Sequence, residues 1–237
     1  MSITAPSGKV FNPDEISLIT ALGNIGFIRY NAQPYMLKSK VESHVYVYGR
    51  EELTANPHVL WSIGREICYL IRDVMDSERD GRRACLIGLP TAGTPLAEAA
   101  ALVDFNEHIT RRDTLFYQMR SVLKGDHGVH NTWLVGKVDT KKHRVFRSDN
   151  VVTDGGTKFE MAERLVQDGL PWDLDEIILV DRQQGALENM RKRGFSKVHV
   201  LWNLLDLTYV FGKTGLWPEE AVAQVEQEIK EHQLLVA

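Results

Sequence analysis

The residues with the clearest chemical potential lie at 148–157, which read SDNVVTDGGT. A short apolar run precedes them and a segment with helical spacing follows. The first N–H groups of a helix lack partners inside it, and the positive end of the helix dipole lies there, so a phosphate suits this segment. Asp149 offers an acceptor for sugar hydroxyl groups. The alternative is an ordinary strand-to-helix turn with an Asp cap.

A second loop of small residues occupies 88–95, with the sequence GLPTAGTP. Gly88 and Gly93 have the glycine spacing of a P-loop, but Thr94 and Pro95 stand where that motif carries Lys and Ser or Thr. The loop still allows a phosphate close to the backbone. Two such loops predict a ligand with two separate phosphate groups, and the absence of a GxGxxG motif argues against a dinucleotide-binding fold.

Cations gather in a third segment, residues 117–131, which has few apolar anchors. Arg120, Lys124 and His127 lie on it. A mobile cationic loop can close over a developing anionic leaving group and exclude water, so we expect a catalytic loop here. The alternative is a solvated hairpin.

The elements that must position these loops follow from hydrophobic periodicity. After residue 83, short apolar runs alternate with Gly-rich turns and helical segments, which predicts a parallel sheet with crossover helices. Ligands bind beyond the carboxyl ends of the strands in such a sheet, so the loops should meet there. The strands are expected at 84–87, 144–147, 176–180 and 198–202, and the helices between them at 96–103, 158–167 and 187–193. Before them we expect helices at 15–22 and 59–74 and strands at 25–30 and 44–48.

Length and composition restrict the class of protein. With 237 residues, 43% of them hydrophobic, the chain is typical of a globular protein that has one domain, or one domain with a small appendage. We expect a domain over 1–215 and a C-terminal helix extension over 216–237. The net charge of -4 argues against a nucleic-acid binder. The longest uncharged run, 84–97, is too short and too rich in Gly and Pro for a membrane span, and no secretory leader is recognisable, so a cytoplasmic protein is expected. Cys68 and Cys85 are expected to be buried thiols.

Four motifs resemble those of one family. VFRSDNVVTDGGTK resembles the phosphoribosyl diphosphate (PRPP) signature of type I phosphoribosyltransferases. LKSKVESHVYVYGR, MRSVLKGDHG and LVDRQQGA are similar to the N-terminal segment, the catalytic loop and the LDRxxG turn of orotate phosphoribosyltransferases, and all four occur in the family's order within 14–207. The chain is therefore identified as a divergent member of this family. The resemblance implies an α/β fold, with a mostly parallel sheet flanked by helices and a small N-terminal hood.

The resemblance also implies an activity. This is a pentosyltransferase (glycosyltransferase) reaction, the Mg-dependent transfer of a phosphoribosyl group from PRPP to orotate, which gives orotidine 5'-monophosphate and diphosphate in pyrimidine synthesis. The Mg is expected to be held mainly by PRPP and water, with no protein ligand set. A homodimer is implied, because loop cations of this family often act across a dimer interface. Membrane and nucleic-acid partners are not expected.

Site residues are carried over by position. Asp149 and Asn150 match the ribose-binding positions, Lys38 the lysine that reaches PRPP, Tyr46 an aromatic position near the base, and Arg182 the arginine that binds orotate. The pyrophosphate loop corresponds to Thr91, Ala92 and Gly93, and the 5-phosphate loop to Val151, Val152, Thr153, Asp154, Gly155, Gly156 and Thr157. The catalytic group implied is Lys124, His127, Arg120 and Asp149.

The chain departs from the family pattern at several of these positions. Asn150 replaces the second acid of the signature, Ser121 a second loop lysine, and Lys40 the Gly of the N-terminal segment, while Ala92 stands where some members have Lys. Two other functions therefore stay open, a phosphoribosyltransferase for another base and a weakly active or inactive regulatory homologue that binds PRPP or a nucleotide. For Arg182, the alternative is an ion pair with Asp181 or Glu188.

Overall fold

The computed structural model describes residues 2–37, 42–49, 51–123 and 132–232. Its centre is a five-stranded parallel sheet with strand order β6-β5-β7-β8-β9. The strands are β5 (Arg83–Gly88), β6 (Leu115–Gln118), β7 (His143–Val152), β8 (Asp175–Asp181) and β9 (Val198–Asn203). The parallel sheet predicted from the apolar runs is confirmed.

Two expected boundaries in this sheet are wrong. Tyr117 and Gln118 were expected in a loop but belong to edge strand β6, whose four residues are too few for a clear alternation. Strand β7 was expected to end at Arg147 but continues to Val152, because its last residues pair with β8, Val151 with Val180 and Val152 with Asp181. Asp149 and Asn150 are therefore in a strand rather than in a turn.

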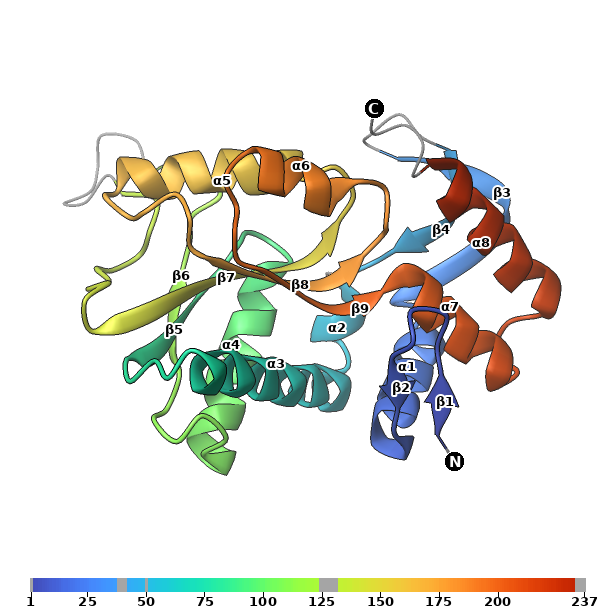
Figure 1. Cartoon of the computed structure of the whole chain (residues 1–237), viewed down its shortest axis with the longest axis horizontal. Coiled ribbons are helices and arrows are strands. Elements are labelled where there is room, and N and C mark those ends of the chain that lie inside the picture. Colours follow the sequence, from blue (N-terminus) through green and yellow to red (C-terminus); the bar gives the residue numbers. More distant parts are fainter. Residues whose placement is uncertain (1, 38–41, 50, 124–131, 233–237) are drawn as a thin grey trace.

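Helices cover both faces of the sheet (Figure 1). On one face lie α3 (Pro57–Ser77) and α4 (Gly93–Glu107), and on the other α5 (Gly156–Gln167) and α6 (Ala186–Lys192). The apolar stripe of α3 is buried in the same cluster as Leu86 of β5 and Phe146 of β7. Burial of such a stripe is what the helical spacing predicts. Helices α3, α4 and α5 extend a few residues beyond the expected ranges, and α6 is shifted by one residue toward the N-terminus.

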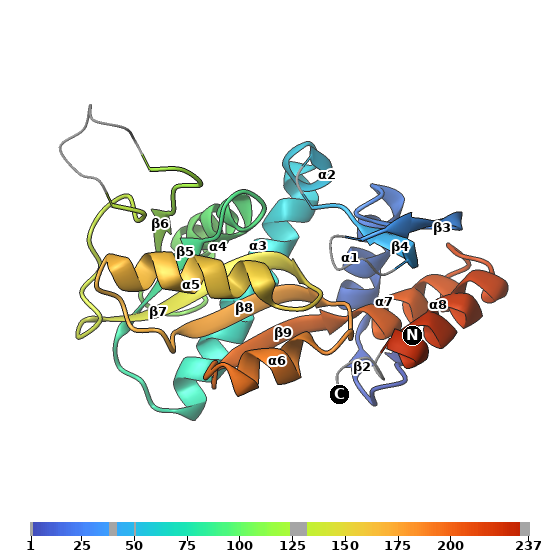
Figure 2. The same ribbon diagram turned by 90° about the horizontal axis from the view of Figure 1, so that it is seen from above.

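The remaining elements form a hood beside the sheet (Figure 2). Its hairpin pairs β3 (Ile28–Met36) with β4 (Glu42–Val47) in antiparallel register. Around the hairpin lie α1 (Pro13–Asn24), α7 (Leu204–Lys213) and α8 (Glu219–His232). The short elements are β1 (Ile3–Thr4), β2 (Val10–Phe11) and α2 (Glu51–Thr54).

Local hydrogen bonds explain where the first of these elements begin. Asn12 caps α1 in a capping box with Glu15, so the helix begins at Pro13, two residues before the expected start. The first hood strand begins at Ile28 instead of residue 25, because the Phe27 N–H donates to Leu22 O and closes the end of α1. Helix α8 begins at Glu219, one residue after Pro218, within the range 216–237 where a C-terminal helix is expected.

The two cysteines and the possible membrane segments are the remaining features for which the sequence supports an expectation. Cys68 and Cys85 are both buried free thiols, as expected, and burial raises the pKa of Cys85 to about 12. In the part of the chain that the structure describes, no helix combines the length and apolar character that a membrane span requires.

Asp80 provides a pH-dependent contribution to folding. Its carboxylate accepts hydrogen bonds from the Arg82 guanidinium, which hold its pKa at about 2. Because the folded-state pKa lies below the unfolded value of about 3.9, the stabilisation is complete above pH 4 and is lost as the pH falls toward 2. We expect Asp80→Asn to reduce the free energy of unfolding by about 1–2 kcal/mol at pH 7, and by nearly nothing at pH 2.

Urea unfolding of both proteins between pH 2 and pH 7 measures this difference. Asp73→Asn is the matched control, since Asp73 is mostly exposed and pairs with its neighbour Arg72. A stability difference for Asp80→Asn that does not change with pH would contradict the assignment.

Candidate functional site

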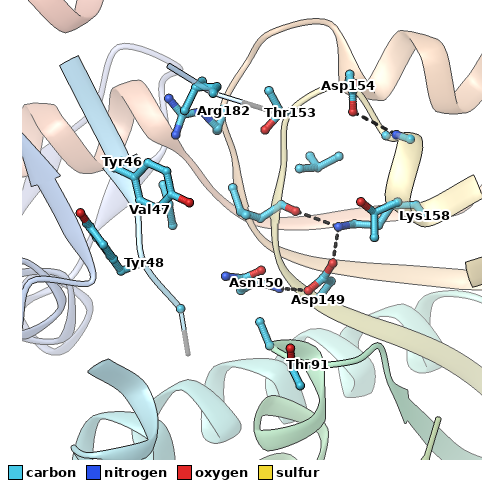
Figure 3. Close-up of a pocket in the computed structure, with 18 of the residues that line it drawn as sticks. Tyr46, Val47, Tyr48, Thr91, Asp149, Asn150, Thr153, Asp154, Lys158 and Arg182 are labelled. Carbon is cyan, nitrogen blue, oxygen red and sulfur yellow. Dashed lines mark hydrogen bonds and ion pairs between the residues drawn. The ribbon is translucent and has the colours of Figure 1, made fainter. Parts of the chain in front are cut away.

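A pocket of about 990 Å³ lies at the carboxyl ends of β5, β7 and β8, where the hood faces the sheet (Figure 3). The hood contributes Tyr46, Val47 and Tyr48 to its wall. The sheet side contributes the loop after β5 and all of residues 149–158. The two small-residue loops selected from the sequence therefore meet at one site, as the parallel topology predicts.

The loop predicted to bind the 5-phosphate turns directly into α5. Gly155 has φ +90° and is followed at once by the first residue of the helix, Gly156. The Gly156 N–H donates to Asp154 Oδ1 at 3.0 Å. A Cβ added at Gly155 would lie 3.0 Å from the Phe159 ring and 3.2 Å from Met190 Cγ, on a backbone that L-residues rarely adopt. The loop thus needs glycine here, and it directs the start of α5 toward the pocket.

Lys158, in the first turn of α5, is a pocket residue that the sequence analysis missed. Its Nζ donates to the Asp149 carboxylate and, at 2.8 Å, to Val151 O, and its side chain is buried. The other oxygen of Asp149 accepts from the Asn150 N–H at 2.8 Å. A cation at the start of a helix opposes the dipole, so this lysine needed a nearby acid, and that is the signal by which the pair could have been found.

Asn150 brings the hood against the end of β7. Its side chain packs on the main chain of Gly49, where a Cβ would lie 2.0 Å from Asn150 Nδ2. Both residues are buried and both line the pocket. Gly49 was not selected from the sequence, because its requirement for glycine comes from a contact between distant segments.

The loop expected to bind pyrophosphate is only partly in this pocket. Thr91 and Ala92 line it, whereas Gly93 is not among its lining residues. A Cβ at Gly93 would lie 1.9 Å from Ser148 O, so this glycine lets the start of α4 pack on β7. The peptide bond between Pro90 and Thr91 is cis.

Arg120 lies in a second pocket, of about 1040 Å³, which shares Thr91 with the first. Its Nη1 donates to Thr132 O at 2.7 Å. The structure thus places Arg120 beside the loop at 88–95 and outside the pocket that holds Asp149. Lys38, Lys124 and His127 lie outside the described residues.

Arg182 is a second buried cation of the pocket, with 3% of its surface exposed. Its Nη2 donates to Ser43 Oγ at 2.7 Å and to Val45 O at 2.8 Å. Its Nε is buried and has no hydrogen-bond partner among the residues described. Burial lowers the pKa of Arg182 to about 10, so the group is still charged at neutral pH. A buried charged donor without a partner is suited to an acceptor on a bound ligand.

The proposed ion pairs of Arg182 with Asp181 or Glu188 are not what the structure contains. Asp181 accepts from the Gln183 N–H, and Glu188 pairs with Lys192. The guanidinium instead holds two oxygens of the hood. This arrangement connects the end of β8 to β4.

Tyrosines form the hood side of the pocket. The ring of Tyr46 lies 4.6 Å from Tyr48 and 5.5 Å from Tyr35, measured between centroids, and 38% of Tyr46 is exposed. The Arg29 guanidinium lies 4.3 Å from the centre of the Tyr48 ring. An exposed aromatic face in a pocket is suited to a planar ring.

The chain is similar in sequence and in fold to several known proteins. No protein-family model matches the chain. The chain is 24% identical over 222 residues to the uridine 5'-monophosphate synthase of Bos taurus, which covers 93% of this chain and 42% of the relative. It is thus similar to less than half of that longer protein.

Solved structures agree with this similarity. The UMP synthase of Leishmania donovani superposes on 91% of this chain and 42% of that chain, with a TM-score of 0.71 and 23% identity. The orotate phosphoribosyltransferase of Francisella tularensis superposes on 91% of this chain and 98% of that chain, with a TM-score of 0.64 and 17% identity. The chain is thus similar in sequence to a part of UMP synthase, and in fold to that enzyme and to orotate phosphoribosyltransferase. It has the type I phosphoribosyltransferase fold, and the expected fold class is confirmed.

Proposed function

We propose that this orotate phosphoribosyltransferase homologue transfers a phosphoribosyl group from PRPP to orotate. One observation carries the proposal: a single pocket combines a Gly-rich loop at the start of α5 with a buried arginine whose Nε has no partner in the described chain. The loop is suited to a phosphate and the arginine to a carboxylate. A phosphorylated sugar and an anionic planar base are the two ligands that such a pocket would bring together.

The pocket residues divide naturally between these ligands. We assign the 5-phosphate to residues 151–157, the ribose hydroxyls to Asp149 and Asn150, and the pyrophosphate to Thr91 and Ala92. The base would lie against Tyr46 with its carboxylate at Arg182. In the reaction a base nitrogen bonds to the anomeric carbon as the bond from that carbon to the diphosphate oxygen breaks, and the diphosphate leaves with the electron pair. The nitrogen gives up the proton that it carried in the free base to solvent or to the diphosphate. Arg120, Lys124 and His127 would then stabilise the charge of the leaving group.

Magnesium fits this arrangement as a companion of the substrate. The described residues include no cluster of three His, Cys, Asp or Glu side chains that could hold a metal, and the Asp149 carboxylate is already paired with Lys158. We therefore assign the Mg to PRPP oxygens and water, where it would offset the charge of the diphosphate. A homodimer and a cytoplasmic location remain predictions.

A second function is favoured by the Asp149–Lys158 pair. With Asn150 neutral and Asp149 paired to a lysine, the end of β7 has no unpaired carboxylate, although two acids are usual in the signature that it resembles. This charge pattern favours a homologue that binds PRPP or a nucleotide but turns it over slowly. A phosphoribosyltransferase for another base is the third candidate function.

One assay separates these functions. The full chain is incubated with PRPP, Mg and orotate, and the loss of orotate and the formation of diphosphate are followed together. The proposed function requires equal amounts of orotate consumed and diphosphate released. PRPP binding by calorimetry without turnover of any base would establish the regulatory alternative, and turnover of another base alone would establish the third.

A further inference from the structure

Helix α8 is attached to the hood through a small polar network. Glu228 Oε2 accepts from the His44 N–H at 2.8 Å and lies 3.4 Å from His44 Nδ1. The Gln224 amide, one turn earlier, contacts His44 Nε2 at 2.9 Å and the Tyr30 hydroxyl. The neighbouring face of α8 is apolar, with Val225 and Ile229 buried in the main core. The helix is therefore held in place while its polar face contacts β3 and β4.

The donors and acceptors of this network are mutually consistent. The Tyr30 hydroxyl donates to Gln224 Oε1, which leaves the amide NH₂ to donate to His44 Nε2. A neutral His44 that accepts at Nε2 carries its proton on Nδ1, on the side of Glu228. Each of the four side chains thus has a partner within the set, and such a network favours one position for β4.

His44 lies between the two residues that hold Arg182. Ser43 and Val45 are both completely buried, and Ser43 Oγ and Val45 O accept from Arg182 Nη2. A displacement of the main chain at His44 would move both acceptors. Glu228 also acts on Arg182 through its charge, because its carboxylate opposes the fall in the pKa of Arg182 that burial causes.

We propose that Glu228 is a positioning residue for base recognition. By holding the His44 N–H, it keeps Ser43 Oγ and Val45 O where they orient the Arg182 guanidinium at the wall of the pocket. Helix α8 then belongs to the base site, although none of its residues lines the pocket. This inference rests on the proposed function, since it needs a base that Arg182 recognises.

Three variants test the role of Glu228. Glu228→Ala removes the acceptor and the charge, and we expect it to raise the KM for orotate about tenfold, with kcat and the KM for PRPP within about twofold of wild type. Glu228→Gln keeps an oxygen for the His44 N–H, so its KM for orotate should rise less. Glu226→Gln is the matched control on the same helix, because Glu226 pairs with Lys230 at the surface, and it should behave as wild type.

The outcomes separate this inference from the proposed function. If wild type does not consume orotate, the proposed function fails and the inference fails with it. If wild type is active and Glu228→Ala leaves the KM for orotate unchanged, the inference alone is wrong. Equal rises in the KM values for orotate and PRPP, or a loss of stability that Glu228→Gln does not restore, would show a merely structural role and would also overturn it.

Discussion

Gly155→Val is expected to lower the affinity for PRPP by at least about 100-fold, which corresponds to about 2.7 kcal/mol. Two causes act together. Gly155 has φ +90°, which a β-branched residue adopts only at a cost of about 1–3 kcal/mol. The new side chain would also press on Phe159 and Met190 and displace the loop at the start of α5. Calorimetric titration with PRPP measures the change directly.

The other end of α5 supplies the matched control. Gly169 has φ +87°, but a Cβ there would have no heavy atom within 4 Å, and the residue is not among those lining the pocket. Gly169→Val should therefore have similar backbone strain and lose stability, while its affinity for PRPP stays normal. Unchanged PRPP affinity in Gly155→Val would count decisively against this loop as the phosphate site.

Arg182→Lys is expected to reduce the preference for orotate over uracil by about 100-fold. Uracil lacks the carboxylate, and an ammonium group cannot reproduce the planar donors that a guanidinium offers to it. The lysine would also lose contacts that Nη2 makes to Ser43 Oγ and Val45 O. The ratio of kcat/KM for the two bases, in wild type and variant, is the decisive measurement.

If Arg182→Lys merely disturbed the packing of the hood, its effect on the two bases would be different. It would lower kcat/KM for orotate and for uracil by the same factor and leave their ratio unchanged. Arg191→Lys, at an exposed position of α6, serves as control and should preserve both values. If wild type already has equal kcat/KM values for orotate and uracil, Arg182 does not recognise the carboxylate, and the assignment of orotate as the substrate fails.

The features that could be recognised in the sequence are those with short-range causes. The parallel sheet follows from apolar runs separated by glycines, because each strand and helix must bury its own residues. The glycine-rich loop at the start of α5 follows from its Gly-Gly pair, and the position of Arg182 at the end of a strand follows in the same way. Edge strand β6 was not predicted, because a strand of four residues that pairs with a neighbour on one side only has almost no recognisable alternation of apolar and polar residues.

The sequence by itself thus determined the α/β class and the strand-end loops where a ligand would bind, since periodicity and glycine spacing are local properties. Tertiary structure decided the chemistry inside the pocket. The Lys158–Asp149 pair, the contact of Asn150 with Gly49 and the link from Glu228 through His44 to Arg182 depend on which side chains the topology brings together. Most of these contacts join segments far apart in the chain, and buried charges and polar groups choose partners by distance in space rather than by spacing in sequence.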